Sequence, residues 1–475
     1  MKKHLILSMM AVLCLTGCGG NANNGGNGGK SGGTVSGDIT LKSASCLSMM
    51  SENCQKYVDD MREQHERLVA DNPNADYYLN DLFGENGVDL TKGVTPCTGD
   101  SGTDGGYREN PETDGNEYLD DVKAEWEKGE KSDENKGVEI SFEVADSLKN
   151  KEYTISYSVN ADLSDAKTLT VEETSARLKN LLVNQKYYYR VSVDGQNSAI
   201  GEFTTGDYPR WIDARPMFNV RDAGGYMTSS GKRIKQGLVY RGGEITAASN
   251  WKSGSSYRGD TGGRYVDSSN RMQDGHIQTY DPNDPNDTRA KDAFRDDMGM
   301  AGGVEIDLRS STERNGYPAK SNYCDFAEND DIAYVLKSIS SYDNGMKNNK
   351  SLIKEVFENY LANADEHPVY YHCYGGADRT GTIGFLLGAV LGMSYTDLVI
   401  DFELTSYSSN PSRDYRSHLR NGPYNYWPRM VNYLKNTLHW SSEKTIQESA
   451  EEFLVNDCSV DTNKIAKIRE IMLED

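Results

Sequence analysis

Residues 368–381 read Pro368-Val-Tyr-Tyr-His372-Cys373-Tyr374-Gly375-Gly376-Ala377-Asp378-Arg379-Thr380-Gly381. The aromatic and β-branched residues before His372 predict a buried strand, and the small and apolar residues from Thr380 to Leu391 predict a buried helix. Backbone N–H groups of a loop between these elements can point inward and, with the helix N-terminus, form an anion site. The same positive field stabilises a thiolate, so Cys373 is expected to be a nucleophile. Arg379 can clamp a phosphate through two hydrogen bonds.

Strands and helices alternate on both sides of this loop. Short β-rich runs occupy residues 238–241, 304–308 and 369–372, and apolar residues at helical spacing precede the last run. The alternation predicts an α/β domain over residues 208–475. Residues 250–287 are polar, rich in Gly and Asp and without periodicity, so they are predicted to be an insertion that can form a lid.

Residues 137–207 have the pattern of a small antiparallel β-sandwich. Apolar and polar residues alternate in several short runs, and Asn, Asp and Gly separate the runs. Three motifs then follow in order: Leu178-Lys-Asn-Leu181, Tyr187-Tyr-Tyr-Arg-Val191 and Gly201-Glu-Phe203-Thr-Thr205. In these motifs the segment resembles a fibronectin type III domain, which implies a spacer or binding module.

The N-terminus carries an export signal. A charged start precedes a short apolar run that ends in Leu15-Thr16-Gly17-Cys18. This ending resembles the processing box of bacterial lipoproteins, which implies that residues 1–17 are removed and that Cys18 is lipidated. The alternative is an ordinary secretory signal with a chance cysteine. Residues 18–37, mostly Gly and Asn at their start, are predicted to be a flexible tether. Because of the export signal and the lipidated Cys18, the protein is expected outside the cytoplasm, lipid-anchored to a bacterial membrane of the cell envelope.

The charge of the chain is strongly acidic. It has 51 Lys and Arg residues against 73 Asp and Glu residues, a formal net charge of −22. This charge repels nucleic acid, so no nucleic-acid partner is expected. Residues 38–136 are an acidic region whose fold the sequence does not determine, although residues 38 to about 98 look partly helical. Runs of Asp and Glu are more typical of a solvated surface than of a metal site, and neither a metal nor another cofactor is expected.

Three more blocks lie around the loop: Phe218-Asn-Val-Arg221-Asp222-Ala-Gly224-Gly225-Tyr226 with Gly237-Leu-Val-Tyr240-Arg241-Gly-Gly243-Glu244, then Val304-Glu-Ile-Asp307-Leu308-Arg309-Ser310 with Glu313-Arg314, and finally Asp401-Phe-Glu403-Leu404-Thr405. With these blocks the sequence resembles the bacterial tyrosine/serine protein phosphatase family, within the cysteine-dependent protein tyrosine phosphatases. The loop of that family reads His-Cys-x-x-Gly-x-Asp-Arg-Thr-Gly. The resemblance extends from residue 208 to the C-terminus.

The resemblance implies a role for each reactive residue of the loop. Cys373 would be the nucleophile and Arg379 the phosphate clamp. Asp378 would be the general acid, since in this family the loop itself supplies the acid. Thr380 would donate a hydrogen bond to the sulfur and help it leave, and His372 would orient the loop.

Other residues are implied to contact the substrate or to support the site. The substrate-binding positions are Tyr374, Gly375, Gly376 and Ala377. Asp307 and Arg309 would support the pocket, with ordinary ion pairing at a strand end as the alternative. Asp222 is a reserve candidate for the acid. The family often has Lys where this chain has Ala377, and in relatives that Lys is associated with highly charged substrates, so substrates with one phosphate are favoured here.

The sequence therefore predicts a multidomain protein, in which a small all-β sandwich of fibronectin III type precedes an α/β domain like that of protein tyrosine phosphatases. The predicted activity is hydrolysis of phosphate monoesters, either protein phosphotyrosine or a small phosphomonoester, through a cysteinyl-phosphate intermediate. Two alternatives are a phytase-like inositol phosphate hydrolase and a non-catalytic phosphate-binding or adhesion lipoprotein.

Overall fold

The structure is a computed structural model, and it describes residues 34–70, 76, 94–95, 108–109, 131–207, 209–215, 217–244, 265–266, 272–273, 293–310, 332–409, 426–437 and 444–475. The predicted signal, the lipidation site at Cys18 and most of the tether lie outside these residues. Of the predicted insertion at 250–287, the structure describes only the paired strands β14 (Tyr265–Val266) and β15 (Met272–Gln273).

The chain divides into two compact units. One unit contains the residues up to Ser48 together with Lys136–Lys179 and Asn184–Gly206. The other contains Met49–Asn135, Asn180–Val183 and Asp207–Asp475.

The first unit consists of two sheets. A six-stranded sheet contains β1 (Thr34–Val35), β10 (Gln196–Asn197), β9 (Lys186–Val193), β6 (Tyr153–Ser158), β7 (Lys167–Val171) and β11 (Gly201–Thr204). A three-stranded sheet contains β2 (Ile39–Ser48), β5 (Gly137–Val144) and β8 (Ser175–Leu178). Alternate residues are buried along β9, and the Phe142 and Tyr153 rings meet edge to face at 5.1 Å between the two sheets. The short helix η1 (Asp146–Leu148) connects β5 to β6.

Strand β2 lies at the start of residues 38 to about 98, which the sequence predicts to be partly helical. Its residues Ile39–Ser48 pair antiparallel with β5, so they belong to the three-stranded sheet of the first unit, whereas the helix begins only at Glu52. The sequence Thr40-Leu-Lys-Ser-Ala-Ser is mostly polar and small, so its alternation is weak. Pairing with β5 is what determines its conformation.

The second unit is built on a five-stranded sheet. Its strands, in spatial order, are β12 (Arg221–Asp222), β13 (Val239–Gly242), β18 (Val369–His372), β16 (Val304–Asp307) and β17 (Ala333–Leu336). The pairs from β13 to β17 are parallel, and β12 is an antiparallel edge strand. All four residues of β18 are buried, as expected for a central strand of a parallel sheet covered on both faces. A separate two-stranded pair joins β3 (Val94–Thr95) to β4 (Arg108–Glu109).

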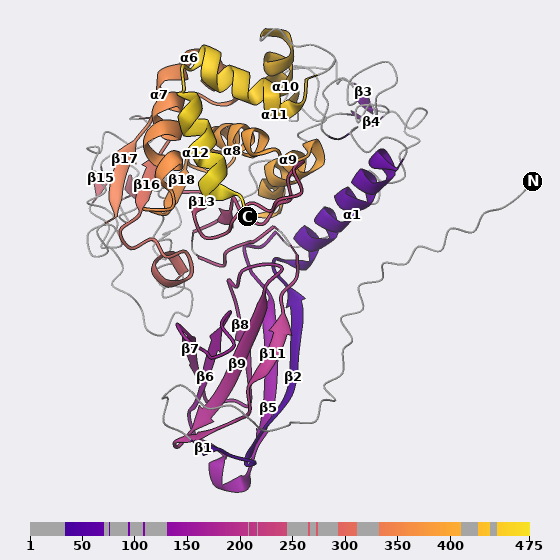
Figure 1. Cartoon of the computed structure of the whole chain (residues 1–475), viewed down its shortest axis with the longest axis vertical. Helices are drawn as coiled ribbons and strands as arrows, with labels where there is room; N and C mark the ends of the chain where they lie inside the picture. The colour runs from indigo at the N-terminus through magenta and orange to yellow at the C-terminus, as the bar shows by residue number, and fades with distance from the viewer. Residues whose placement is uncertain are drawn as a thin grey trace, which may run out of the picture. The chain divides into compact units, whose positions relative to one another are not determined.

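Figure 1 shows the helices of this unit, of which α1 contacts α9. They are α1 (Glu52–Val69), α6 (Tyr342–Asn348), α7 (Lys350–Glu355), α8 (Asp378–Leu391), α9 (Tyr395–Glu403), α10 (Tyr426–Thr437), α11 (Ile446–Glu452) and α12 (Thr462–Met472), with the shorter turns η3 (Ala293–Asp297), η4 (Val356–Tyr360), η5 (Leu361–Asn363), η6 (Leu404–Tyr407) and η8 (Phe453–Asp457). Within the described residues, no helix has both the length and the apolar character needed to cross a membrane.

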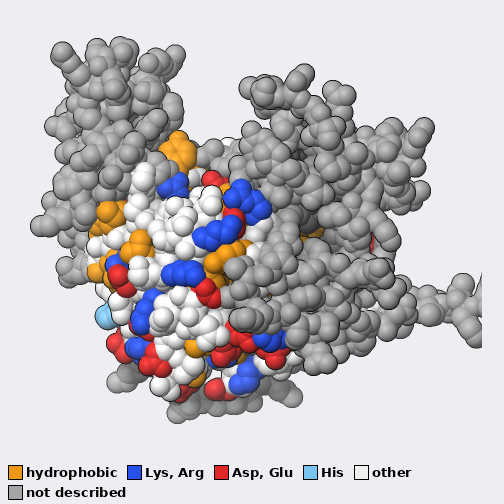
Figure 2. Space-filling model, turned by 90° about the horizontal axis from the view of Figure 1, so that it is seen from above, with side chains coloured by type: hydrophobic (Ala, Val, Ile, Leu, Met, Phe, Trp, Pro, Cys, Tyr) orange, Lys and Arg blue, Asp and Glu red, His pale blue; other side chains and the backbone are white. Residues whose placement is uncertain are grey.

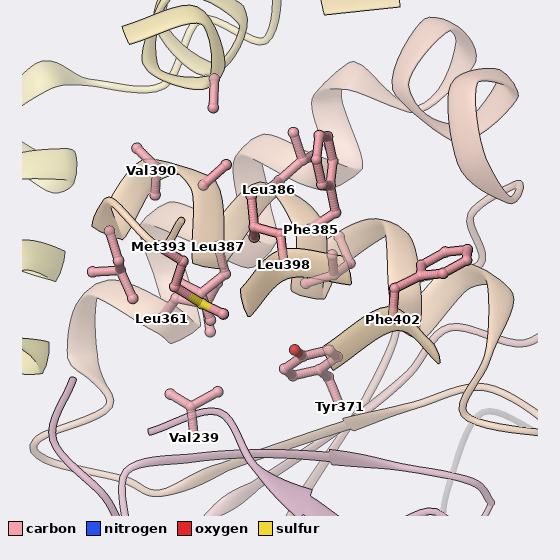
Figure 3. Packing of buried hydrophobic residues seen from close by; sticks show 14 of the residues in the cluster. Val239, Leu361, Tyr371, Phe385, Leu386, Leu387, Val390, Met393, Leu398 and Phe402 are labelled. Carbon is pink, nitrogen blue, oxygen red and sulfur yellow. The ribbon is translucent and has the colours of Figure 1, made fainter. Parts of the chain in front are cut away.

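Helix α8 lies at the centre of the main apolar core. Every residue from Thr380 to Leu391 is buried, because the helix is apolar on all sides and is enclosed by its neighbours. Figure 3 shows its side chains packed with those of α9 above Val239 of β13 and Tyr371 of β18. Gly392, with φ of 94°, ends the helix in the left-handed conformation. The helix that follows the predicted loop is therefore held rigidly by the core.

The described surface carries charges of both signs. Figure 2 shows Lys and Arg side chains interspersed with Asp and Glu side chains and with isolated apolar groups. Some exposed charges among the described residues pair, such as Lys42 with Glu143 at 2.7 Å and Lys186 with Glu202 at 2.9 Å. Such exposed pairs add little to stability.

Candidate active site

The loop between β18 and α8 begins at Cys373, whose side chain is only 1% exposed. The loop lies at the carboxyl end of the central parallel strand, the edge where α/β sheets place their ligand sites. Asp378 is the first residue of α8, so the N-terminus of a buried 14-residue helix opens at the loop. A loop followed by a helix N-terminus is a favourable position for an anion.

Three consecutive carbonyl groups of the loop are held from outside it. The Glu244 amide donates to the Tyr374 carbonyl at 3.0 Å, and the Asn219 amide donates to the Gly375 carbonyl at 3.0 Å. The Arg241 guanidinium donates to the Gly376 carbonyl at 3.1 Å. Because N–H and C=O point in opposite directions across a trans peptide, the N–H groups of the next residues point away from these donors. The loop is therefore arranged to present peptide N–H groups to an oxyanion.

Gly376 gives the loop both its shape and its close packing. Its φ is 67°, in the left-handed region that favours glycine. A Cβ at this position would lie 2.4 Å from the carbonyl carbon of Gly242 and 2.6 Å from the amide nitrogen of Gly243. No side chain fits there, so the loop can lie directly against β13.

Two buried arginines connect the loop to α9. Arg241, on β13, forms an ion pair with Asp401 and is 1% exposed. Arg221, on β12, donates to the Asp401 carbonyl at 2.9 Å and lies 5.4 Å from the Trp211 ring. Burial lowers the pKa of Arg221, and the neighbouring charge of Arg241 lowers it further. The network places two guanidinium groups and one carboxylate in a region with little water, so it carries a net positive charge whose field is weakly screened.

His372, predicted to orient the loop, is the last residue of β18 and directly precedes Cys373. The ring is fully buried, with Nδ1 3.1 Å from the Cys373 carbonyl and Nε2 3.0 Å from a Glu305 carboxylate oxygen. The ring also stacks on Tyr370 at 5.5 Å. Hence His372 connects the start of the loop to β16.

Asp307 and Arg309 form a buried ion pair at the end of β16. Arg309 binds both carboxylate oxygens of Asp307, at 3.0 and 2.9 Å, and donates to Glu244 at 2.7 Å. Burial raises the pKa of Asp307, but the charges of Arg309 and His372 and two hydrogen bonds hold it well below its usual range. Since the Glu244 amide donates to the loop, this pair acts on the loop through Glu244.

Both carboxylate oxygens of Asp222 accept hydrogen bonds from buried donors. Its oxygens accept from Arg210 at 2.8 Å and from the amides of Gly224 and Gly237, each at 2.8 Å. Burial raises the pKa of Asp222, against the opposing charge of Arg210. These contacts favour a structural role, so the structure gives no support to Asp222 as the acid.

Asp378, Arg379 and Thr380, which are predicted to react, form the first turn of α8. Asp378 and Arg379 are half-buried, and Asp378 accepts a hydrogen bond from the Tyr342 hydroxyl. The Thr380 hydroxyl is buried and has no hydrogen-bond partner among the described residues, so the expected bond to the Cys373 sulfur is not formed here.

The predicted substrate-binding positions differ in exposure. Tyr374 is 37% exposed, whereas Gly375, Gly376 and Ala377 are buried. Tyr374 is therefore the one side chain of residues 373–377 that reaches solvent.

Sequence reasoning assigned no role to five residues that the structure places around the loop. They are Asn219, Arg241, Glu244, Tyr342 and Asp401. Three of the five, Arg241, Glu244 and Asp401, carry charges, and they lie in the sequence blocks that resemble the phosphatase family. Their type and position gave a signal, but their contacts come from distant parts of the chain. Tyr342 had no such signal.

The tyrosine phosphatase family matches residues 212–254 and 303–474. The two ranges contain the five-stranded sheet, helices α6 to α12 and every candidate residue from Asp222 to Thr380. The interval between them contains most of the predicted insertion. No curated protein is significantly similar to the chain. In the part of the chain that the structure describes, no group of three or more His, Cys, Asp or Glu side chains is placed to hold a metal ion. The match supports a phosphatase of the protein-tyrosine-phosphatase type, and it suggests a phosphorylated substrate.

Proposed function

We propose that this protein is a cysteine-dependent phosphatase that hydrolyses phosphate monoesters through a cysteinyl-phosphate on Cys373. The observation that carries the proposal is the loop itself. Its three carbonyls are held outward by Glu244, Asn219 and Arg241, and the loop joins a buried cysteine to a helix N-terminus. Such a site binds the equatorial oxygens of a phosphoryl group.

The reaction has two steps. The Cys373 thiolate attacks phosphorus, the S–P bond forms as the P–O bond to the leaving group breaks, and Asp378 gives its proton to the departing oxygen. Water then attacks phosphorus, Asp378 takes a proton from that water, and the S–P bond breaks to release inorganic phosphate and the thiolate. Arg379 and the loop amides stabilise the phosphoryl charge in both steps.

The substrate is a phosphotyrosine-like ester or a small ester with one phosphate. Two features support this choice: Ala377 supplies no cation at the loop, and Tyr374 offers an exposed aromatic surface beside Cys373.

The proposal also includes lipid anchoring through Cys18 outside the cytoplasm, and this part rests on the sequence. In a labelling experiment, the wild type is expected to incorporate labelled fatty acid, whereas Cys18→Ala is expected to incorporate none.

Hydrolysis of 4-nitrophenyl phosphate tests the chemistry. We expect turnover by the wild type in the presence of a chelator, and none by Cys373→Ser. Cys46→Ser is the matched control, because Cys46 lies in the first unit, whereas the candidate site belongs to the second. Rapid quenching should trap phosphate on the Cys373 peptide. Full activity in Cys373→Ser would refute the proposal, and a panel of phosphotyrosine peptide, nucleoside monophosphate and phytate would define the substrate.

A further inference from the structure

Tyr342 has an unusual backbone conformation at the start of α6. Its φ is 57°, in the left-handed region, although it is a bulky residue with a Cβ. Its side chain is only 6% exposed. A non-glycine residue is held in this region only when its surroundings determine the conformation, and such residues concentrate at functional sites. The contacts of Tyr342 therefore hold its backbone in this conformation.

Tyr342 binds the first turn of α8 at two points. Its amide donates to the Thr382 hydroxyl at 2.7 Å, and that hydroxyl donates to the Asp378 carbonyl at 2.9 Å. The phenol of Tyr342 donates to the Oδ1 atom of Asp378. Backbone and side chain of Tyr342 thus both connect to Asp378.

The start of α6 is itself firmly attached to the unit. Asp343 forms ion pairs with Lys347 at 2.5 Å and with Arg429 of α10 at 2.7 Å. The Ser340 amide donates to Asn349 at 2.8 Å. The phenol of Tyr342 therefore extends from a fixed point and can restrict the carboxyl group that it contacts.

We propose that Tyr342 is a positioning residue that holds the Asp378 carboxyl group in the rotamer needed for proton transfer. The inference rests on the proposed function, in which Asp378 is the acid. With Oδ1 occupied by the phenol, the transferable proton is on Oδ2. The proton passes from Oδ2 to the departing oxygen in the first step, and Oδ2 takes the proton of water in the second. Tyr342 itself neither gains nor loses a proton.

The leaving group of the substrate provides the test. 4-Nitrophenolate leaves readily without an acid, whereas phenolate needs protonation, so kcat/KM should be compared for 4-nitrophenyl phosphate and phenyl phosphate. In Tyr342→Phe, kcat/KM for phenyl phosphate is expected to fall about tenfold or more, because a positioned acid contributes about 10²-fold or more. The kcat/KM for 4-nitrophenyl phosphate is expected to fall less than about threefold. A structural defect would lower both by the same factor.

Tyr334→Phe is the matched control. The Tyr334 hydroxyl donates to Asp307 at 2.7 Å, so its loss removes a similar tyrosine–carboxylate bond that does not involve Asp378. We expect this variant to change both substrates equally. Thr382→Val, which removes the other connection, should shift the ratio in the same direction as Tyr342→Phe, and it provides a second variant should Tyr342→Phe fold poorly.

The outcomes separate the inference from the function on which it rests. An unchanged ratio in Tyr342→Phe and Thr382→Val, with activity still dependent on Cys373, would overturn the role of Tyr342 alone. An unchanged ratio in Asp378→Asn would overturn the assignment of the acid and this inference with it. Addition of Tyr342→Phe to Asp378→Asn should alter the ratio no further.

Discussion

The side-chain amide of Asn219 donates a 3.0 Å hydrogen bond to the carbonyl of Gly375, at the middle of the loop between β18 and α8. The same amide donates to the Thr405 hydroxyl at 3.1 Å, and the Asn219 backbone amide donates to Asp133 at 2.7 Å. Asn219 is fully buried, so none of these partners has water as a substitute. One asparagine thereby joins the loop, Asp133 and Thr405, each of which is more than eighty residues from Asn219 in the chain.

Replacement of Asn219 should weaken both the fold and the activity. Asn219→Gly tolerates the φ of 59° but leaves the Gly375 carbonyl without its donor, and a buried unsatisfied group costs about 1–3 kcal/mol. We expect a lower unfolding free energy in urea and a kcat lowered about tenfold as the loop loses its geometry. The exposed Asn463→Gly is the control for the loss of an asparagine; equal kcat values for wild type and Asn219→Gly would contradict this role.

Gly376→Ala should be far more damaging than the same change at Gly299. Both glycines have a positive φ, 67° and 64°, so both alanines carry a conformational cost of about 1–2 kcal/mol. A Cβ on Gly299 meets no atom within 4 Å, whereas one on Gly376 would clash with Gly242 at 2.4 Å. Thermal melts and 4-nitrophenyl phosphate turnover should show activity retained in Gly299→Ala and lost in Gly376→Ala. Comparable activity in the two variants would mean that the close contact is unimportant.

Removal of Arg309 should destabilise the second unit strongly. Arg309→Met leaves Asp307 and Glu244 buried without their cation, which costs about 3–5 kcal/mol. Arg295→Met is the matched control, because the Arg295–Asp296 pair is exposed and is expected to contribute less than about 1 kcal/mol. Urea unfolding followed by tryptophan fluorescence would measure both; similar midpoints would show that the buried pair is not needed.

Asp397 should make the stability of the second unit depend on pH. Burial raises the pKa of Asp397 to about 6, although Arg62 opposes the shift. Between about pH 4 and pH 6 the native state holds a proton that the unfolded state has lost, so this contribution makes stability fall as pH rises, and the penalty is complete above pH 6.

Asp397→Asn is accordingly expected to raise the unfolding free energy by about 2–3 kcal/mol at pH 8 and by much less at pH 4.5. Denaturant unfolding at the two pH values is the measurement, with the exposed Asp365→Asn as the control. A gain of the same size at both pH values would contradict the assignment.

The sequence alone was sufficient to predict the central part of the second unit. The apolar run 369–371 and the apolar residues 380–391 each have one favourable environment, the interior, so β18 and α8 could be placed on either side of Cys373. The α/β alternation and several strands of the first unit were likewise visible as periodicity. Strand β2 was not, because its polar residues become a strand only through pairing with β5.

The amino-acid sequence alone determined that a cysteine, an aspartate and an arginine follow one another across a junction of strand, loop and helix. Only the tertiary structure decided which distant groups hold that junction: Asn219, Arg241 and Glu244 on the loop carbonyls, and Tyr342 on Asp378. The physical reason is that periodicity reports burial, whereas a hydrogen bond depends on the relative position of two groups in space. That position is set by the packing of the whole unit, and no local pattern of residues encodes it.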